Sequence, residues 1–136
     1  MEKHDYIFEM PLRVRDYEVD SQGIVNNAIY LHYIEHTRHE FCRWAGTSFR
    51  AMQQQGIDPV IRHIDIEYLT PLRLGDDMVS CLNLSREGAR FVFHQDIYTL
   101  PDRRPVIRAK ATVVCLRDGR LTRGDELADE FQRFLQ

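Results

Sequence analysis

Apolar and polar residues alternate one by one along much of this chain, which is the pattern of a strand with one buried face. The segments with this pattern span residues 8–14, 60–69, 78–85, 91–99 and 106–116. Short turns rich in Gly and Asp separate the last four, so consecutive strands are expected to pair antiparallel. Pro11 interrupts the first segment. Since proline cannot donate a hydrogen bond to a sheet, we expect that strand at an edge.

A helical spacing of apolar residues replaces this alternation over residues 26–45. Tyr30, Ile34 and Phe41 fall on one stripe, with Thr37 filling the turn between them. The interleaved polar residues are His32, Glu35, Arg38 and His39. Twenty residues of helix are roughly 30 Å long, enough to cross a small sheet.

The ends of this helix carry capping residues. Asn26 or Asn27 can accept a hydrogen bond from the first free N–H groups, and Gly46 can end the helix in a left-handed turn. A second, shorter helix is expected from about Asp125, because Leu127, Phe131 and Leu135 are spaced by four.

The expected order is therefore strand, long helix, four strands and short helix, without internal repeats. The long apolar stripe needs a partner, and the sheet is the only large surface available. We predict an α+β fold with an antiparallel sheet curled around one long central helix, as a single domain over residues 1–136.

Composition narrows the function classes. The chain has 136 residues, of which 43% are hydrophobic and 29% charged, with a net charge of −3. This charge argues against nucleic acid as a partner, because phosphate backbones require clustered positive charge. No apolar run is long enough to span a membrane. The segment MEKHDYIFEM has no apolar core of a secretory signal, which favours a cytoplasmic location.

Cys42, Cys81 and Cys115 lie far apart among apolar neighbours. Their odd number and wide spacing fit neither a disulfide framework nor a metal site. We expect buried, reduced thiols.

The segment from Asp20 to Asn27 combines a carboxylate, a glycine and a helix start. Gly23 permits a tight turn that brings the backbone close to a ligand. The first N–H groups of a helix lack intrahelical partners and stabilise negative charge. A carboxylate facing such groups could perform acyl transfer, with one group activating the attack and the other holding the oxyanion. The alternative is a simple capped loop with Asp20 as a surface turn residue.

Two stretches of the chain resemble the hot-dog-fold acyl-CoA thioesterases, in particular the 4-hydroxybenzoyl-CoA thioesterase family. The first is Asp20-x-x-Gly23-Ile24-Val25 followed by Asn27, Tyr30, Tyr33 and Glu35; the second is residues 66–76, IEYLTPLRLGD. The order of elements matches as well. The resemblance implies hydrolysis of an acyl-CoA thioester to a carboxylic acid and coenzyme A, without metal or cofactor.

The same resemblance implies residue roles. Asp20 corresponds to the catalytic carboxylate, acting as nucleophile or as general base, and the N–H of Asn27 corresponds to the group that polarises the thioester carbonyl. Glu35 occupies the helix position from which a partner subunit reaches the acyl group. Since the family's site is shared across a dimer interface, a homodimer or homotetramer is expected.

The chain also departs from the family. Asn26 and Asn27 replace the aromatic pair of some aryl-CoA members, which argues against an aromatic acyl group. Val25-Asn26-Asn27 is similar to plant acyl-ACP thioesterases, but Ile24 and Gln22 stand where those carry a His and an Asn. An acyl-carrier protein therefore stays open as an alternative carrier of the acyl group.

Several residues have competing interpretations. Arg38 and His39 lie three and four residues after Glu35, where a helical salt bridge is expected. Arg104, beside Arg103 in a connecting loop, could contact the coenzyme A phosphates or be a solvated charge. Arg62 and Arg120 stay open as other phosphate contacts.

His32-Tyr33-Ile34-Glu35-His36 matches the H-x-x-E-H pattern of zinc hydrolases. A zinc hydrolase is thus a third hypothesis, after thioesterase and a non-catalytic hot-dog module that binds acyl-CoA or acyl-carrier protein. The metal hypothesis is the weakest, because no helix supplies an evident third ligand.

Overall fold

The computed structural model describes residues 6–135. The prediction about a secretory signal concerns residues 1–10, of which residues 1–5 lie outside the described part. The helices are α1 (Asn27–Trp44), α2 (Phe49–Gln54) and α3 (Asp125–Glu130), with 3-10 turns η1 (Asp16–Glu18) and η2 (Gln132–Phe134). The strands are β1 (Phe8–Arg13), β2 (Asp58–Tyr68), β3 (Asp77–Glu87), β4 (Arg90–Thr99), β5 (Pro105–Arg117) and β6 (Arg120–Leu121).

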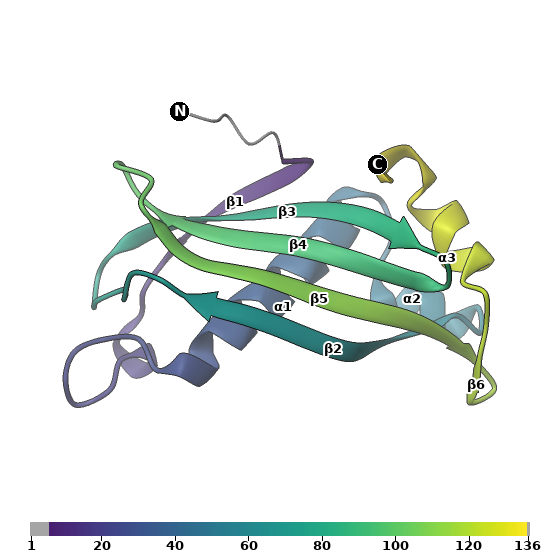
Figure 1. Cartoon of the computed structure of the whole chain (residues 1–136), viewed down its shortest axis with the longest axis horizontal. Coiled ribbons are helices and arrows are strands. Elements are labelled where there is room, and N and C mark those ends of the chain that lie inside the picture. The colour runs from purple at the N-terminus through teal and green to yellow at the C-terminus, as the bar shows by residue number, and fades with distance from the viewer. Residues whose placement is uncertain (1–5, 136) are drawn as a thin grey trace.

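One antiparallel sheet holds all the strands, in the order β1-β3-β4-β5-β2, with β6 paired to β5. The sheet curves around α1, which crosses one of its faces (Figure 1). This confirms the expected α+β architecture, which is that of the hot-dog fold. β1 is an edge strand, as Pro11 predicts.

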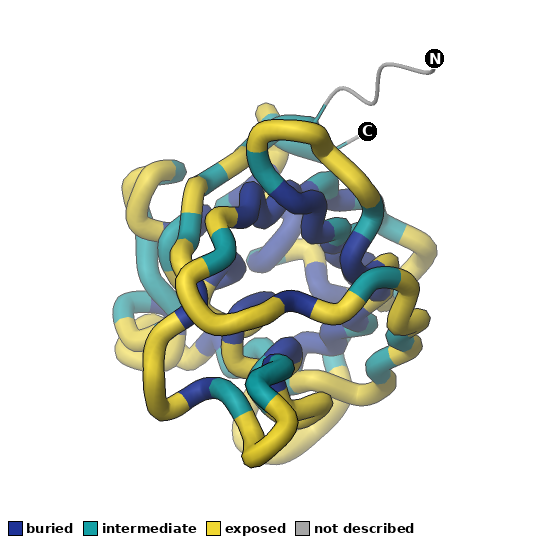
Figure 2. The backbone as a smooth tube through the Cα atoms, turned by 90° about the vertical axis from the view of Figure 1, so that its left-hand side faces the viewer, coloured by how far each residue is buried: buried dark blue, intermediate teal, exposed yellow. Residues whose placement is uncertain are grey.

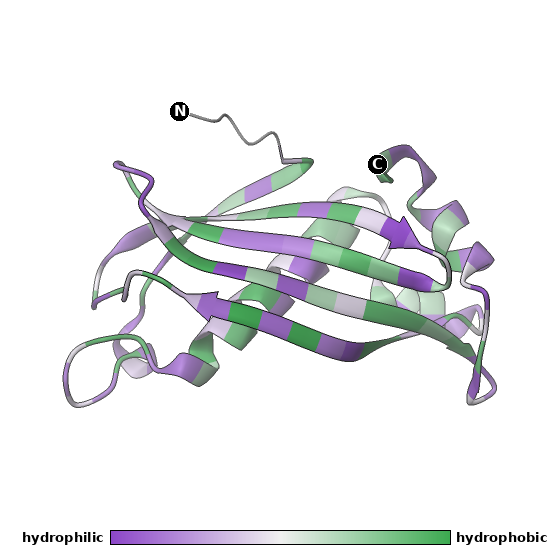
Figure 3. Ribbon diagram, viewed as in Figure 1, coloured by the Kyte–Doolittle hydropathy of each residue, from purple (hydrophilic) through white to green (hydrophobic). Residues whose placement is uncertain are grey.

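The alternation in the sequence divides the sheet into two faces (Figure 3). On β4, Phe91, Phe93 and Ile97 are buried in the core toward α1. The intervening residues His94 and Asp96 lie on the outer face, which no helix covers (Figure 1). Figure 2 looks along the molecule from the end where α1 begins and shows buried backbone inside a rim of exposed loops.

The helix ends follow the capping residues. Asn26 is the N-cap, and its side-chain oxygen accepts a hydrogen bond of 2.9 Å from the Ala28 N–H. Gly46 follows α1 with φ +92°. The sequence analysis missed α2, which Ser48 caps by accepting a hydrogen bond from the Ala51 N–H.

The prediction that Arg38 lies on the polar face of α1 is wrong. Its side chain is only 5% exposed and donates from Nη1 to Gln95 Oε1 at 2.9 Å. Gln95 in turn donates to the Ile34 carbonyl oxygen at 2.8 Å. Beside this pair, the hydroxyls of Thr37 and Ser80 lie 2.7 Å apart. A polar layer therefore runs through the contact between α1 and the sheet.

All three cysteines are buried and free, as expected. Burial raises the pKa of Cys42 and Cys81 to about 12, so these thiols are poor nucleophiles near neutral pH.

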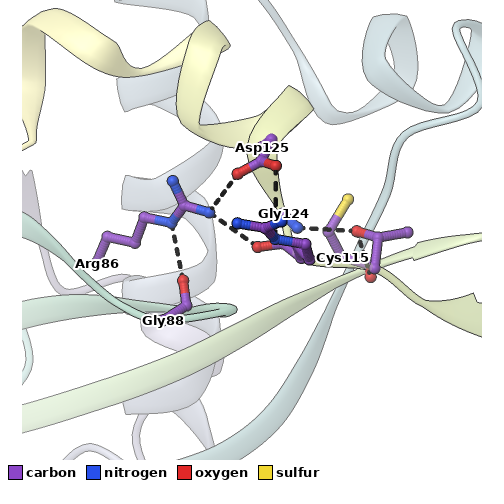
Figure 4. A network of polar contacts seen from close by, with 7 residues as sticks. Arg86, Gly88, Cys115, Gly124 and Asp125 are labelled. Atoms are coloured by element: carbon purple, nitrogen blue, oxygen red, sulfur yellow. Dashed lines mark hydrogen bonds and ion pairs between the residues drawn. The ribbon is translucent and has the colours of Figure 1, made fainter.

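A polar network joins α3 to the hairpin between β3 and β4 (Figure 4). Arg86 donates to the carbonyl oxygens of Gly88 and Arg123 and to the Asp125 carboxylate, at 2.8, 2.9 and 2.8 Å. Gly124 begins this helix with φ +81°, and a Cβ built there would lie 2.6 Å from the Phe91 ring. Only glycine fits this junction without strain or movement of the core.

We predict that Gly124→Ala destabilises the protein more than Gly119→Ala does. Gly119 also has a positive φ, +76°, but its Cβ would meet nothing within 4 Å. Backbone strain alone should cost the control about 1 kcal/mol, and the contact with Phe91 should add roughly 1–3 kcal/mol at Gly124. Urea unfolding of both variants measures the difference; equal losses would contradict the steric argument.

Candidate active site

The loop from Val19 to Val25 folds back on itself immediately before α1. Val19 and Val25 form an antiparallel bridge, and the Asp20 N–H donates to the Ile24 carbonyl oxygen at 2.9 Å. The Gly23 N–H donates to the Asp20 carbonyl oxygen at 3.0 Å, with Gly23 at φ +79°. Ile24 also bridges to Arg73, which ties the loop to the connection between β2 and β3.

The Asp20 carboxylate is exposed, and one of its two oxygens is held by this loop. Oδ1 accepts hydrogen bonds from the N–H groups of Gln22 and Ile24, at 2.8 and 3.4 Å. Oδ2 has no hydrogen-bond partner among residues 6–135. The loop thus orients the carboxylate while leaving one oxygen available to a water molecule or a substrate.

The start of α1 offers the complementary group. The Asn27 N–H has no acceptor within the described part of the chain, and the dipole of an 18-residue helix adds partial positive charge there. Asn27 also lines a cavity of about 150 Å³ with Tyr30, Tyr68, Pro71 and Val106. A carbonyl oxygen placed in this cavity could accept a hydrogen bond from the helix start.

Two tyrosines form one wall of the cavity. Their rings lie 5.6 Å apart, edge to face. Tyr68 donates to the Asn27 carbonyl oxygen at 3.3 Å, and the Tyr30 hydroxyl accepts a hydrogen bond of 3.1 Å from the Leu72 N–H. Burial raises the pKa of Tyr30. These contacts fix the wall to both α1 and the β2–β3 connection.

A buried carboxylate beneath the loop was not foreseen. Glu18 is 5% exposed and accepts hydrogen bonds from the Tyr33 hydroxyl at 2.7 Å and the Arg15 N–H at 2.8 Å. Its carbonyl oxygen accepts from the Asn26 N–H at 3.1 Å. Burial, together with the Glu18 hydrogen bond, raises the pKa of Tyr33 far above its usual range, so its hydroxyl stays a donor. Glu18 therefore links the residue that precedes the loop to α1 through hydrogen bonds.

Glu35 and Arg104 do not join this site within one chain. Glu35 is exposed on α1 and forms no salt bridge with the described residues, which contradicts the helical pairing expected with Arg38 or His39. Arg38 turns into the sheet instead, and the His39 ring packs against Phe49, with ring centroids 5.2 Å apart. Arg104 pairs with Asp102 at 3.0 Å, and neither Glu35 nor Arg104 lines the cavity beside Asn27.

The zinc pattern does not assemble a metal centre. His32, Glu35 and His36 are exposed on α1. Across residues 6–135, no group of three or more His, Cys, Asp or Glu side chains could hold a metal ion. A catalytic zinc site normally needs three protein ligands, so the zinc-hydrolase hypothesis lacks its coordination sphere. In the same range, no helix is both long and apolar enough to cross a membrane.

Comparison with known proteins relates this chain to thioesterases. A family profile described as "Thioesterase-like superfamily" matches residues 14–135. Acyl-acyl carrier protein thioesterase ATL3 of Arabidopsis thaliana is 38% identical over 109 residues, covering 79% of this chain and 57% of that protein. Acyl-CoA thioester hydrolase YbgC of Escherichia coli O6:H1 is 31% identical over 112 residues, covering 81% of this chain and 82% of that one.

Solved structures with the same fold also include a probable thioesterase. YbaW, a probable thioesterase from Escherichia coli, superimposes with a TM-score of 0.80 at 25% identity and covers 94% of this chain and 98% of its own. This chain spans less than two thirds of the length of the plant relatives, so their whole-protein properties do not transfer directly.

We predict that Tyr33→Phe destabilises the protein by roughly 1–3 kcal/mol, because it leaves a buried carboxylate without its hydroxyl donor. Tyr17→Phe is the matched control, since Tyr17 is 75% exposed and, among residues 6–135, its hydroxyl is hydrogen-bonded to the Arg15 guanidinium alone. Denaturant unfolding should show a clear loss for the first variant and almost none for the second. Equal stability of the two variants would remove Glu18 as an anchor of the loop.

Proposed function

This chain belongs to the thioesterase-like superfamily, and we propose that it hydrolyses an acyl-CoA thioester to a carboxylic acid and coenzyme A. One observation carries the proposal. Within residues 6–135, one short segment carries a carboxylate with an oxygen that has no partner, Asp20, and a helix N–H without an acceptor, Asn27. Asn27 lines the cavity, and Asp20 lies outside its lining, seven residues earlier in the same segment. These are the two kinds of group that hydrolysis of an acyl group requires.

In the proposed reaction, the thioester carbonyl oxygen accepts a hydrogen bond from the Asn27 N–H. Negative charge develops on that oxygen as the carbon becomes tetrahedral, and the helix start stabilises it. Asp20 removes a proton from water as the water oxygen bonds to the carbonyl carbon. The carbon–sulfur bond then breaks, and the thiolate takes up the proton.

A second route is possible for the same carboxylate. Asp20 could attack the carbonyl carbon directly; the carbon–sulfur bond then breaks, and coenzyme A leaves as a thiolate that takes a proton from water. The hydroxide that remains then hydrolyses the resulting anhydride, which releases the carboxylic acid and restores the Asp20 carboxylate. A single turnover in ¹⁸O-labelled water distinguishes the two routes, because only the second can place the label in the Asp20 carboxylate. Both routes use Asn27 in the same way.

The site is proposed to be completed by a second copy of the chain in a homodimer or homotetramer. Tyr68 and Leu69, which line the cavity with Asn27, are exposed in the single chain. Leu31 in the first turns of α1 and Leu74 in the connection between β2 and β3 are exposed as well. Exposed large apolar side chains beside a cavity are typical of a protein interface. A partner covering these side chains would exclude water from the cavity and could bring its own Glu35 toward the acyl group.

The thiol carrier is proposed to be coenzyme A, with acyl-carrier protein as the alternative to be tested. Among the relatives, YbgC is named for acyl-CoA and ATL3 for acyl-acyl carrier protein. Thiol release from matched acyl-CoA and acyl-carrier-protein substrates would rank the two carriers. Tight binding of both without turnover would instead support a non-catalytic binding module, in which Asp20 serves only to shape its loop.

We predict that Asp20→Asn lowers kcat/KM for acyl-CoA by on the order of 10²–10⁴-fold, the range for loss of a positioned acid–base group. Asparagine retains the Oδ1 acceptor, so the loop should persist. Asp16→Asn removes the same charge from an exposed residue of the preceding turn and should stay near wild-type activity. Thiol release over a panel of acyl-CoAs measures both, and full activity of Asp20→Asn would refute the role of this carboxylate.

We also predict that Leu74→Asp disrupts the oligomer and lowers thioesterase activity together with it. Leu74 is 53% exposed in the single chain, so the substitution should leave the monomer folded. Leu121→Asp is the control, because Leu121 is 60% exposed on β6 at the opposite end of the sheet (Figure 1). Sedimentation velocity and thiol release should show a lighter, less active Leu74 variant and an unchanged control. An unchanged Leu74 variant would place the interface elsewhere.

A further inference from the structure

An irregularity in β2 places two basic side chains side by side. Along the β2–β5 ladder, Ile61 pairs with Val113 and His63 pairs with Thr112, so Arg62 is an extra residue without a partner. Such a β-bulge breaks the strict alternation of faces and redirects a side chain. Arg62 and His63, although consecutive, line the same hollow.

This hollow lies on the outer face of the sheet, away from α1. It has a volume of about 310 Å³ and is lined by Arg62, His63, Arg90 and Thr112. The strand neighbours Phe91 and Val113 point into the core, which puts Arg90 and Thr112 on the opposite face. The hollow is therefore separate from the cavity beside Asn27, which lies at one end of the sheet.

The positive charges of the hollow have no ion-pair partner in the described part of the chain. Eight arginines outside the hollow form ion pairs with acidic residues, whereas others, such as Arg50 and Arg73, form none among residues 6–135; the paired ones are Arg13, Arg15, Arg43, Arg86, Arg103, Arg104, Arg117 and Arg123. Neither Arg62 nor Arg90 has an ion pair or side-chain hydrogen bond with any residue between 6 and 135. Glu87 lies opposite Arg90 in the ladder but does not pair with it.

A neighbouring hollow on the same face is lined by both acidic and basic side chains. It is lined by the acids Asp65, Glu67 and Asp96 together with Arg108 and Lys110. In the ladders, Arg108 sits between Glu67 and Asp96, and Lys110 sits opposite Asp65, so the acids facing these cations also line their hollow. Glu87, which faces Arg90 in the ladder, does not line the hollow at the bulge. The hollow at the bulge has no acidic lining, although the whole chain carries a net charge of −3. Repulsion between uncompensated cations favours binding of an anion there.

We propose that this hollow binds the phosphate group of a small molecule. Two guanidinium groups offer paired N–H donors whose geometry matches phosphate oxygens. The Thr112 hydroxyl and the His63 ring can add hydrogen bonds. A site with two arginines suits a phosphate monoester; a nucleic acid would need a longer basic track than the rest of this face provides. The proposal stands whether or not the chain hydrolyses thioesters.

Isothermal titration with inorganic phosphate and with adenosine 3′,5′-bisphosphate tests the site, at constant ionic strength in chloride. The wild-type protein should bind phosphate saturably, and Arg62→Gln/Arg90→Gln should weaken binding by at least about tenfold. The control Arg50→Gln/Arg123→Gln removes the same charge from two exposed residues outside the hollow and should bind as wild type does. Thermal unfolding checks that both variants are folded.

The outcomes separate the possibilities. Tighter binding of the bisphosphate would identify a nucleotide as the source of the phosphate group, and equal affinity would identify free phosphate; both support the site. Failure of the wild-type protein to bind either probe would overturn the proposal. Equal loss in the two double variants would overturn it as well, because net charge alone would then explain the binding.

Discussion

The contact between α1 and the sheet is built around a buried charge, that of Arg38. Arg38 is held in the helix–sheet contact by Gln95, which also donates to the carbonyl oxygen of Ile34 on the same helix. Burial lowers the pKa of Arg38, an effect that the charge of Glu35 opposes. An arginine stays charged even so, and a buried charge without its partner is costly. Together with the Thr37–Ser80 contact, this pair favours one register of α1 on the sheet, because a shift would leave buried polar groups without partners.

The register of α1 decides where its first N–H groups lie, and hence where a carbonyl oxygen could be held. Glu18 transmits that position to the loop, because its side chain is bound by Tyr33 of α1 while its carbonyl oxygen binds the Asn26 N–H. The loop then orients Asp20 through its own backbone. The carboxylate is therefore placed by a chain of hydrogen bonds that begins inside the core, although it lies on an exposed loop. Geometry set by rigid elements is what an acyl-transfer site requires.

The sequence predicted the architecture well because alternation and helical spacing report burial directly. Pro11 located an edge strand, and Asn26 and Gly46 located the ends of α1. The charge of Arg38 predicts an exposed position, but its spacing predicts a buried one. Arg38 follows Ile34 by four residues and precedes Phe41 by three, so it lies on the apolar stripe. Glu18 could not be found, since its partner Tyr33 is fifteen residues away and no local pattern announces their contact. The sequence pattern also does not decide whether Asp20 is catalytic, because an aspartate that only shapes its loop would give the same pattern.

The bulge at Arg62 affects both the edge of the sheet and its outer face. This strand is 11 residues long and lies at the edge of the sheet, so one side of its backbone is unpaired. A long regular edge invites open-ended pairing between chains, and a bulge with charged side chains interrupts it. The same extra residue places Arg62 next to His63 over a hollow without acids. The irregularity in the strand therefore shapes the hollow on the outer face at which we propose that an anion binds.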